Sequence, residues 1–251
     1  MTAVVPAPGT HRDGLTATAT LTVDRDGGRP RIRWSHAWPV VLRPTGDEQV
    51  HLVHGAGGPL GGDVLSLGVT VGAGTALRVR SAGATMVQLG RGAEPARWDA
   101  TVDVGAGGRL DWAPEPTVVT DGAAFDTSLR IALAGDATAV VREIVVLGRH
   151  GRTGGRYRGR LDVTVGDDPL LAHTTLLGGA DPALRGPAVT AGARAVGTLL
   201  VAGDPGDRRG AGEVSGVRWA WTALDGPGAL LLAVGDPGPV TTLLDEAARG
   251  S

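Results

Sequence analysis

The chain has 251 residues, a net charge of −2, 42 glycines and no cysteine. This charge balance argues against bulk electrostatic binding to nucleic acid or to an anionic membrane, and the lack of cysteine excludes disulfides and thiolate metal sites. No apolar run approaches the roughly 18 residues of a transmembrane helix, and the polar start has no signal-peptide core. We therefore expect a cytoplasmic protein with one domain over residues 1–251, in which residues 1–14 are a flexible start.

Short segments of alternating or β-branched residues recur along the chain, and glycine-rich turns separate them. Residues Leu15–Val23 alternate strictly and predict a strand, with Arg31–Trp34 as its hairpin partner. Further strands are predicted at Val50–Val53, Val64–Val71, Ala76–Arg80, Arg97–Val104, Arg109–Trp112, Phe125–Leu133, Ala139–Leu147, Tyr157–Val165, Leu170–Leu177 and Arg194–Val201. Closely spaced strands with few helical patterns indicate a mainly β fold of stacked or sandwiched antiparallel or mixed sheets.

Three turns resemble one another in sequence. Residues 71–74, 104–108 and 133–136 read Val-Gly-Ala-Gly, Val-Gly-Ala-Gly-Gly and Leu-Ala-Gly-Asp. They suggest stacked hairpins of similar size, although the likeness is too loose to define a sequence repeat.

A couple of short helices complete the expected fold. Residues Val240–Arg249 place their apolar residues on one face, and Gly250 provides a stop signal. A shorter helix around Asp181–Gly192 is interrupted by Pro187, and a looser region is expected at Ala202–Gly212.

The segment from Gly57 to Asp63 reads Gly-Gly-Pro-Leu-Gly-Gly-Asp between two apolar runs. Clustered glycines indicate backbone that bends tightly or approaches another group closely. A phosphate-binding loop would need a lysine and a following helix, and the chain contains no lysine. The segment therefore predicts a tight bend, with the Asp63 carboxylate at the start of the next strand.

Sequence patterns of common enzymes are missing, since neither Gly-x-Ser-x-Gly nor His-Glu-x-x-His occurs. His51 and His54 lie on a predicted strand, where positions three apart face opposite sides, so we interpret them as ordinary surface or turn histidines. A run of arginines could form a phosphate site, a solvated loop or a partner-facing patch. These arginines are Arg142, Arg149, Arg152, Arg156, Arg158 and Arg160.

Two further segments carry acidic residues in unusual settings. Residues 110–117 read Leu-Asp-Trp-Ala-Pro-Glu-Pro-Thr, and the two prolines end a strand and force an extended backbone. Either this segment is a rigid loop over a core tryptophan, Trp112, or it holds Glu115 in a defined, partly buried place. Glu143 begins an apolar strand, and a buried carboxylate there would need a partner or would be a metal or proton site.

Taken in this order and spacing, these segments resemble the urease accessory protein UreD family, called UreH in some bacteria. The likeness covers about residues 30–200, includes a Pro-Leu-Leu strand at 169–171, and is poor in the C-terminal part. The family-motif positions are Gly57, Gly58, Gly62, Trp112, Pro114, Pro116, Gly148 and Arg149.

The resemblance implies a non-enzymatic scaffold of stacked β-sheets with two helices that serves urease maturation. Such proteins bind apo-urease and UreF, and through UreF they recruit the GTPase UreG, which brings nickel. GTP would be hydrolysed only on that partner. Nickel would pass through an internal channel of the scaffold without being bound tightly.

By position, the resemblance makes Asp63, Thr85, Glu143 and His173 the candidate residues of this nickel path. His173 stands where the family usually has a glutamate, and imidazole binds nickel well. A few weak ligands suit a metal in transit, because a tight, closed site would trap it.

Two other functions remain open from the residues alone. A β-rich ligand- or carbohydrate-binding module would show exposed, stacked tryptophans, whereas Trp98 and Trp112 lie in apolar strand contexts that favour burial. A glycoside hydrolase would need two of the carboxylates Asp63, Glu115 and Glu143 at about 5–10 Å from each other.

Overall fold

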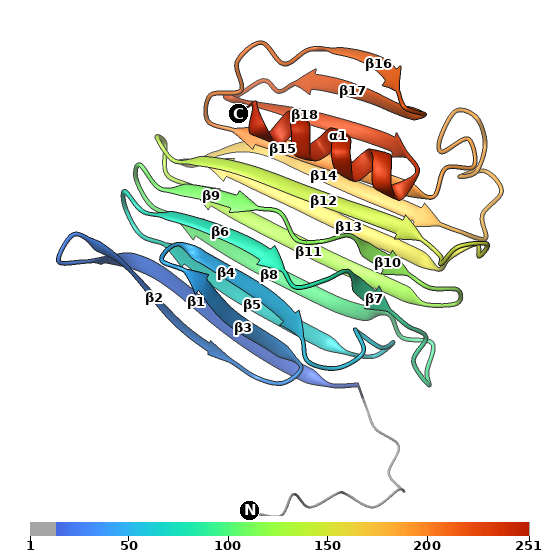
Figure 1. Ribbon diagram of the computed structural model, residues 1–251, viewed down its shortest axis with the longest axis horizontal. Helices are drawn as coiled ribbons and strands as arrows, with labels where there is room; N and C mark the ends of the chain where they lie inside the picture. Colours follow the sequence, from blue (N-terminus) through green and yellow to red (C-terminus); the bar gives the residue numbers. More distant parts are fainter. Residues whose placement is uncertain (1–13, 251) are drawn as a thin grey trace, which may run out of the picture.

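The structure is a computed structural model that describes residues 14–250. These residues form two stacked β-sheets with one helix on the outer face of the larger sheet (Figure 1). Sheet A has seven strands: β1 (Thr16–Asp26), β2 (Arg29–His36), β5 (Val64–Val71), β8 (Ala96–Val104), β11 (Ala124–Leu133), β13 (Arg156–Val165) and β14 (Asp168–Gly178). Sheet B has eleven: β3 (Val40–Gly46), β4 (Gln49–His54), β6 (Ala76–Ser81), β7 (Thr85–Val87), β9 (Arg109–Trp112), β10 (Thr117–Val119), β12 (Thr138–Leu147), β15 (Ala195–Ala202), β16 (Gly210–Val214), β17 (Val217–Ala223) and β18 (Gly228–Gly235).

The middle of the chain coils between the two sheets. From β5 in sheet A the chain crosses to β6 in sheet B, and from β8 in sheet A it crosses to β9 in sheet B. It then crosses in the same way from β11 in sheet A to β12 in sheet B. Neighbouring strands in this region are therefore parallel, as β5 with β8, β8 with β11 and β6 with β9 show. Parallel strands need a crossover connection, and here the opposite sheet supplies it. The predicted mainly β fold of stacked, mixed sheets is confirmed.

The three similar turns are corners of this coil. Each one carries the chain from a strand of sheet A to a strand of sheet B, and the corners stack through bonds such as Gly105 N–H to the Val71 carbonyl at 2.8 Å. Gly74 and Gly107 both have φ +61°, a left-handed conformation that glycine adopts at little cost. The expectation of stacked hairpins is wrong, because a hairpin would keep both of its strands in one sheet.

The helical predictions are partly confirmed. The helix α1 (Pro237–Arg249) begins three residues before the predicted start at Val240, and Pro237 suits the first turn because its missing N–H has no helical partner there. The predicted helix around Asp181–Gly192 consists of turns. The looser region predicted at Ala202–Gly212 is confirmed only for residues 203–209, because Ala202 ends β15 and Gly210 begins β16. Within residues 14–250, no helix is long and apolar enough to span a membrane.

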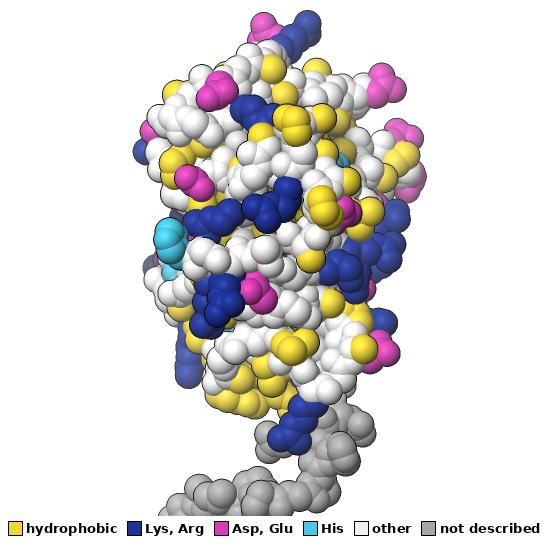
Figure 2. Space-filling view, turned by 90° about the vertical axis from the view of Figure 1, so that its right-hand side faces the viewer, with side chains coloured by type: hydrophobic (Ala, Val, Ile, Leu, Met, Phe, Trp, Pro, Cys, Tyr) yellow, Lys and Arg dark blue, Asp and Glu magenta, His cyan; other side chains and the backbone are white. Residues whose placement is uncertain are grey.

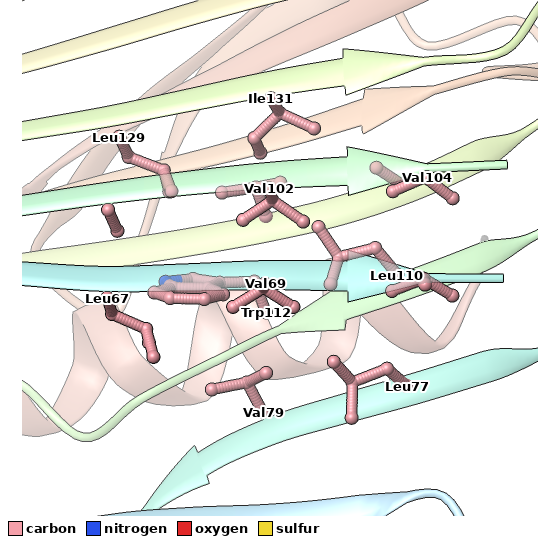
Figure 3. Close-up of a cluster of buried hydrophobic side chains, with 14 of the residues drawn as sticks. Leu67, Val69, Leu77, Val79, Val102, Val104, Leu110, Trp112, Leu129 and Ile131 are labelled. Carbon is pink, nitrogen blue, oxygen red and sulfur yellow. The ribbon is translucent and has the colours of Figure 1, made fainter. Parts of the chain in front are cut away.

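The inner faces of the two sheets pack into an aliphatic core. Figure 3 shows Leu67, Val69, Val102 and Ile131 of sheet A facing Leu77, Val79, Leu110 and Trp112 of sheet B. A second interlayer cluster, which includes Phe125 and Leu147, lies nearer the beginning of β11 and the end of β12. Between the two clusters, polar side chains interrupt the apolar packing, among them Thr127 of β11 and Glu143 of β12.

Candidate functional site

A cavity of about 70 Å³ lies between the sheets at this polar interruption. Its walls come from both interlayer clusters, with Leu52 and Leu129 from one and Phe125 from the other. A cavity of this size can hold a few water molecules. The polar and charged residues that line it are His54, Ser81, Thr85, Glu115, Thr117, Thr127, Ser128, Glu143 and Tyr157.

Glu143 is the interior carboxylate of this cavity. On β12, Val141, Glu143 and Val145 alternate onto the inner face of sheet B. Among residues 14–250, no hydrogen bond or ion pair engages its carboxylate. Burial raises the pKa of Glu143 from 4.5 to about 7, because the low-dielectric interior disfavours the charged carboxylate.

Two hydroxyl groups of sheet A face this carboxylate. Tyr157 Oη and Thr127 Oγ1 form a hydrogen bond of 3.0 Å. Burial and the negative charge of Glu143 both raise the pKa of the Tyr157 phenol, which therefore stays protonated. The Ser128 hydroxyl is also buried without a partner in the described part of the chain. Alternation on β11 directs it to the outer face of sheet A, beside Asp126 and Arg130, so it does not face the carboxylate.

His54 is a cavity residue that the sequence interpretation missed. His51 and His54 do lie on opposite faces of β4, and His51 Nδ1 is 2.8 Å from Thr45 Oγ1. The assignment of His54 to the surface is wrong, because its ring lines the cavity and packs edge-on against Trp98 at 6.1 Å between centroids. Burial lowers the pKa of His54 and favours the neutral imidazole, the form that can bind a metal.

Thr85 and the Trp-x-Pro-x-Pro segment line the same cavity. Trp112 is buried, as predicted, and Pro114 and Glu115 form part of the cavity wall. Glu115 N–H donates to Ser81 Oγ at 2.9 Å, and Thr85 N–H donates to the carbonyl of Pro116 at 3.0 Å. The segment thus both covers the tryptophan and positions Glu115, although Glu115 is exposed and not partly buried as expected.

Asp63 lies outside the lining of this cavity. Its side chain is buried, with 4% of the residue exposed, and the backbone uses both oxygens. Oδ1 accepts the Leu15 N–H at 2.7 Å, and Oδ2 accepts the Leu60 N–H at 2.9 Å. The fold therefore gives this carboxylate a backbone-capping role and does not bring it to Glu143.

The glycine segment around Asp63 is a place where backbones cross closely, as predicted. Gly58 has φ +112°, and a Cβ added there would lie 1.8 Å from the Met86 carbonyl oxygen. A Cβ on Gly14 would lie 1.9 Å from the carbonyl oxygen of Gly62, which itself has φ +93°. Gly14 is thus exposed to solvent but lies close to the backbone of Gly62, and the rest of the expected flexible start lies outside the described residues.

His173 also lies away from the cavity lining. It is on β14, the edge strand of sheet A, with Nε2 3.1 Å from Thr175 Oγ1, and burial lowers its pKa. The Leu-Gly-Arg positions form the turn after β12, where Gly148 has φ +73° and Arg149 is exposed.

The arginine run does not form one surface. Arg142 is buried on the α1 side of sheet B, where it pairs with Asp245 and donates to the Pro114 carbonyl at 2.8 Å. Arg156, Arg158 and Arg160 are exposed on β13. On the side shown in Figure 2, arginine side chains form separate groups mixed with acidic and apolar side chains.

Within residues 14–250, no three or more His, Asp or Glu side chains are grouped to hold a metal ion. The cavity instead offers one carboxylate in its interior, one neutral imidazole and several hydroxyls. This donor set can contact a cation through a few ligands at a time.

Comparison with known proteins identifies the family. A family model described as UreD urease accessory protein matches residues 15–238. The chain belongs to this UreD family. UreD proteins of Parafrankia sp., Frankia alni and Streptomyces avermitilis are 40%, 38% and 37% identical, over 93%, 91% and 93% of this chain and 88%, 90% and 96% of their own lengths. The family match extends to residue 238, beyond the range of about 30–200 expected from the sequence.

Several of the UreD-family positions fall into two structural groups. Trp112, Pro114, Thr85 and Glu143 line the interlayer cavity. The family glycines shape backbone turns, as Gly58, Gly62 and Gly148 show by their positive φ angles. Membership of the UreD family supports a urease accessory role and gives no support to a carbohydrate-binding module.

Proposed function

We propose that this protein is a urease maturation scaffold that helps deliver nickel to the urease active site through its interior. It binds apo-urease and UreF, and through UreF it recruits UreG, on which GTP is hydrolysed. The observation that carries the proposal is the interlayer cavity, where Glu143 is an unpartnered carboxylate in a chain of the UreD family. The role is that of a conduit and a docking partner, without a catalytic step of its own.

The chemistry of the lining suits a cation in transit. The interior of the cavity offers the Glu143 carboxylate, the His54 imidazole and the Thr85 hydroxyl, all of which are acceptable nickel ligands. Coulombic attraction is stronger in a buried site than in water, so one carboxylate attracts a divalent ion effectively. A single charged ligand with neutral donors also releases the ion readily, because the coordination is neither closed nor rigid. Asp63 and His173 do not line this cavity.

Reconstituted urease activation tests this function. Apo-urease is incubated with UreF, UreG, GTP, nickel and either the wild-type chain or Glu143→Gln, and urease activity is measured. We expect Glu143→Gln to lower activation by about tenfold, the usual scale for losing a group that tunes a metal site. Pull-down of UreF and apo-urease should be unchanged. Glu246→Gln, which removes an exposed carboxylate from α1, is the matched control.

The two parts of the proposal fail separately. If Glu143→Gln supports full urease activation, the nickel path through the cavity is contradicted and the scaffold role stands. Failure of the wild-type chain to retain UreF or apo-urease would contradict the scaffold role itself.

A further inference from the structure

Sheet B has a gap where two neighbouring strand paths, β6 to β7 and β9 to β10, are interrupted at the same height of the sheet. β9 ends at Trp112 and β10 begins at Thr117, while β6 ends at Ser81 and β7 begins at Thr85. β12 continues past this level and pairs with β9 before it and with β10 after it, so residues 142–144 have no paired strand on this side. Prolines 114 and 116 contribute to the interruption because they carry no N–H for a strand ladder.

The interruption separates the interlayer cavity from a cleft on the other face of sheet B. This outer cleft has a volume of about 500 Å³, and Asp245 of α1 forms part of its lining. Glu115 lines both the outer cleft and the inner cavity. Ser81 and Pro114, at the edges of the interruption, line the inner cavity. The interrupted part of the sheet is therefore a thin wall between two hollows.

The charges around the outer cleft leave one carboxylate without a partner. Arg80 pairs with Asp111, and Arg142 pairs with Asp245. Arg249, the third arginine, donates from Nε to the backbone carbonyl of Asp245. Among residues 14–250, no hydrogen bond or ion pair engages the Glu115 carboxylate. Two unpartnered carboxylates, Glu115 at the wall and Glu143 in the cavity, thus lie in series.

We propose that this gap in sheet B is the opening through which a divalent cation passes between the outer cleft and the interlayer cavity, with Glu115 as the receiving carboxylate. The inference rests on the proposed function, because it names the way to Glu143. Apolar clusters fill the interlayer space on both sides of the cavity, and a cation would lose its hydration there without replacement. At the gap, carboxylate and hydroxyl oxygens replace part of that hydration.

Arg142 acts as a positioning residue for the wall. Its guanidinium donates to the Pro114 carbonyl at 2.8 Å from the outer side, while Glu115 N–H is held by Ser81 on the other side of the gap. The segment that carries Glu115 is thereby fixed at both edges. The side chain of Glu115 itself remains free to contact an ion.

Stopped-flow fluorescence with nickel alone tests the opening in the full chain. Nickel is paramagnetic and quenches nearby tryptophans, and Trp98 and Trp112 both line the cavity. The rate and the final amplitude of quenching at micromolar nickel are compared for wild type, Glu115→Gln, Glu115→Asp, Glu143→Gln and the control Glu246→Gln. We expect Glu115→Gln to slow quenching by about tenfold, the lower end of electrostatic effects on association rates. Its final amplitude should be kept. Glu115→Asp should restore the rate, and Glu246→Gln should match wild type.

The results test the opening and the interior nickel site separately. Normal rates for Glu115→Gln together with a lost amplitude for Glu143→Gln would overturn the opening and leave the interior nickel site in place. Full amplitude and rate in Glu143→Gln, or no quenching in the wild type, would overturn the interior site as well. Thermal unfolding separates the expected result from misfolding: among residues 14–250 no hydrogen bond or ion pair engages the Glu115 carboxylate, so Glu115→Gln should unfold at the wild-type temperature.

Discussion

Arg142 and Glu143 are adjacent on β12, and their side chains lie on opposite faces of sheet B. Arg142 pairs with Asp245 of α1 and donates to the Pro114 carbonyl, whereas Glu143 lines the interlayer cavity without a partner. Successive residues of a strand point to opposite faces, so this geometry follows from their adjacency. On one face of sheet B this dipeptide contacts α1 and the wall of the cavity, and on the other face it supplies the interior carboxylate.

Glu143 should make stability fall as pH rises. Its pKa is raised from 4.5 to about 7 in the folded chain, so the folded state binds the proton more tightly than the unfolded state. The resulting stabilisation is present in full below the ordinary pKa and is lost as pH rises through the folded pKa. We expect the free energy of unfolding to fall by about 3 kcal/mol between these two pKa values, as measured by urea unfolding at several pH values. Glu143→Gln should lack this component, and identical pH profiles for the two proteins would contradict it.

Asp63→Ala should act on stability. Removal of the carboxylate leaves the N–H groups of Leu15 and Leu60 without their acceptor, in a part of the fold where Asp63 is buried. We expect urea unfolding to show a loss of about 3 kcal/mol, since hydrogen bonds to charged groups contribute about 1.5–3 kcal/mol each. Asp63→Asn keeps one acceptor oxygen and should lose less. Lost urease activation at unchanged stability would instead place Asp63 on the nickel path.

Arg142→Met and Asp245→Asn should both destabilise the fold. Loss of Arg142 leaves the Pro114 carbonyl without this donor, and loss of the Asp245 charge leaves the buried Arg142 guanidinium without its counter-charge. We expect thermal unfolding to report a loss of about 3 kcal/mol in the free energy of unfolding for each variant. Arg91→Met removes an exposed arginine and serves as the control. Equal, small effects for all three variants would show that the ion pair does not hold α1 against the wall.

Gly58→Ala should disrupt the crossing beneath the glycine segment. The residue has φ +112°, and its new Cβ would collide with the Met86 carbonyl oxygen. We expect a loss of about 3 kcal/mol or more in the free energy of unfolding. Gly92→Ala is the matched control, because a Cβ there meets nothing within 4 Å. Equal stabilities of the two variants would exclude the close approach.

Strands with one buried face were predictable from sequence. The predicted bounds of Val64–Val71 and Arg109–Trp112 coincide with β5 and β9, because their apolar residues alternate or are flanked by glycine turns. β18 was missed because most of its residues are buried, so no alternation marks it. β7 and β10 were missed because three residues each cannot show a period.

The site was only partly predictable. An acidic residue in an apolar strand pointed to Glu143, and the Trp-x-Pro-x-Pro prolines pointed to Glu115. His54 was missed because alternation separates it from His51 but does not say which face of the strand is internal. Asp63 became a candidate for the nickel path because it matches the acidic position of the family's glycine segment. The sequence does not show that its carboxylate accepts hydrogen bonds from backbone N–H groups.

By itself, the sequence determined the β-rich class, the family resemblance and the candidate carboxylate Glu143, because these depend on local periodicity and short motifs. Only the tertiary structure decided that the chain coils between two sheets and that Glu143, His54, Thr85 and Glu115 line one cavity. It also decided that Asp63 and His173 lie apart from them. The physical reason is that local pattern sets which side of a strand is apolar, whereas non-local packing sets which strands become neighbours and where their apolar faces leave a gap.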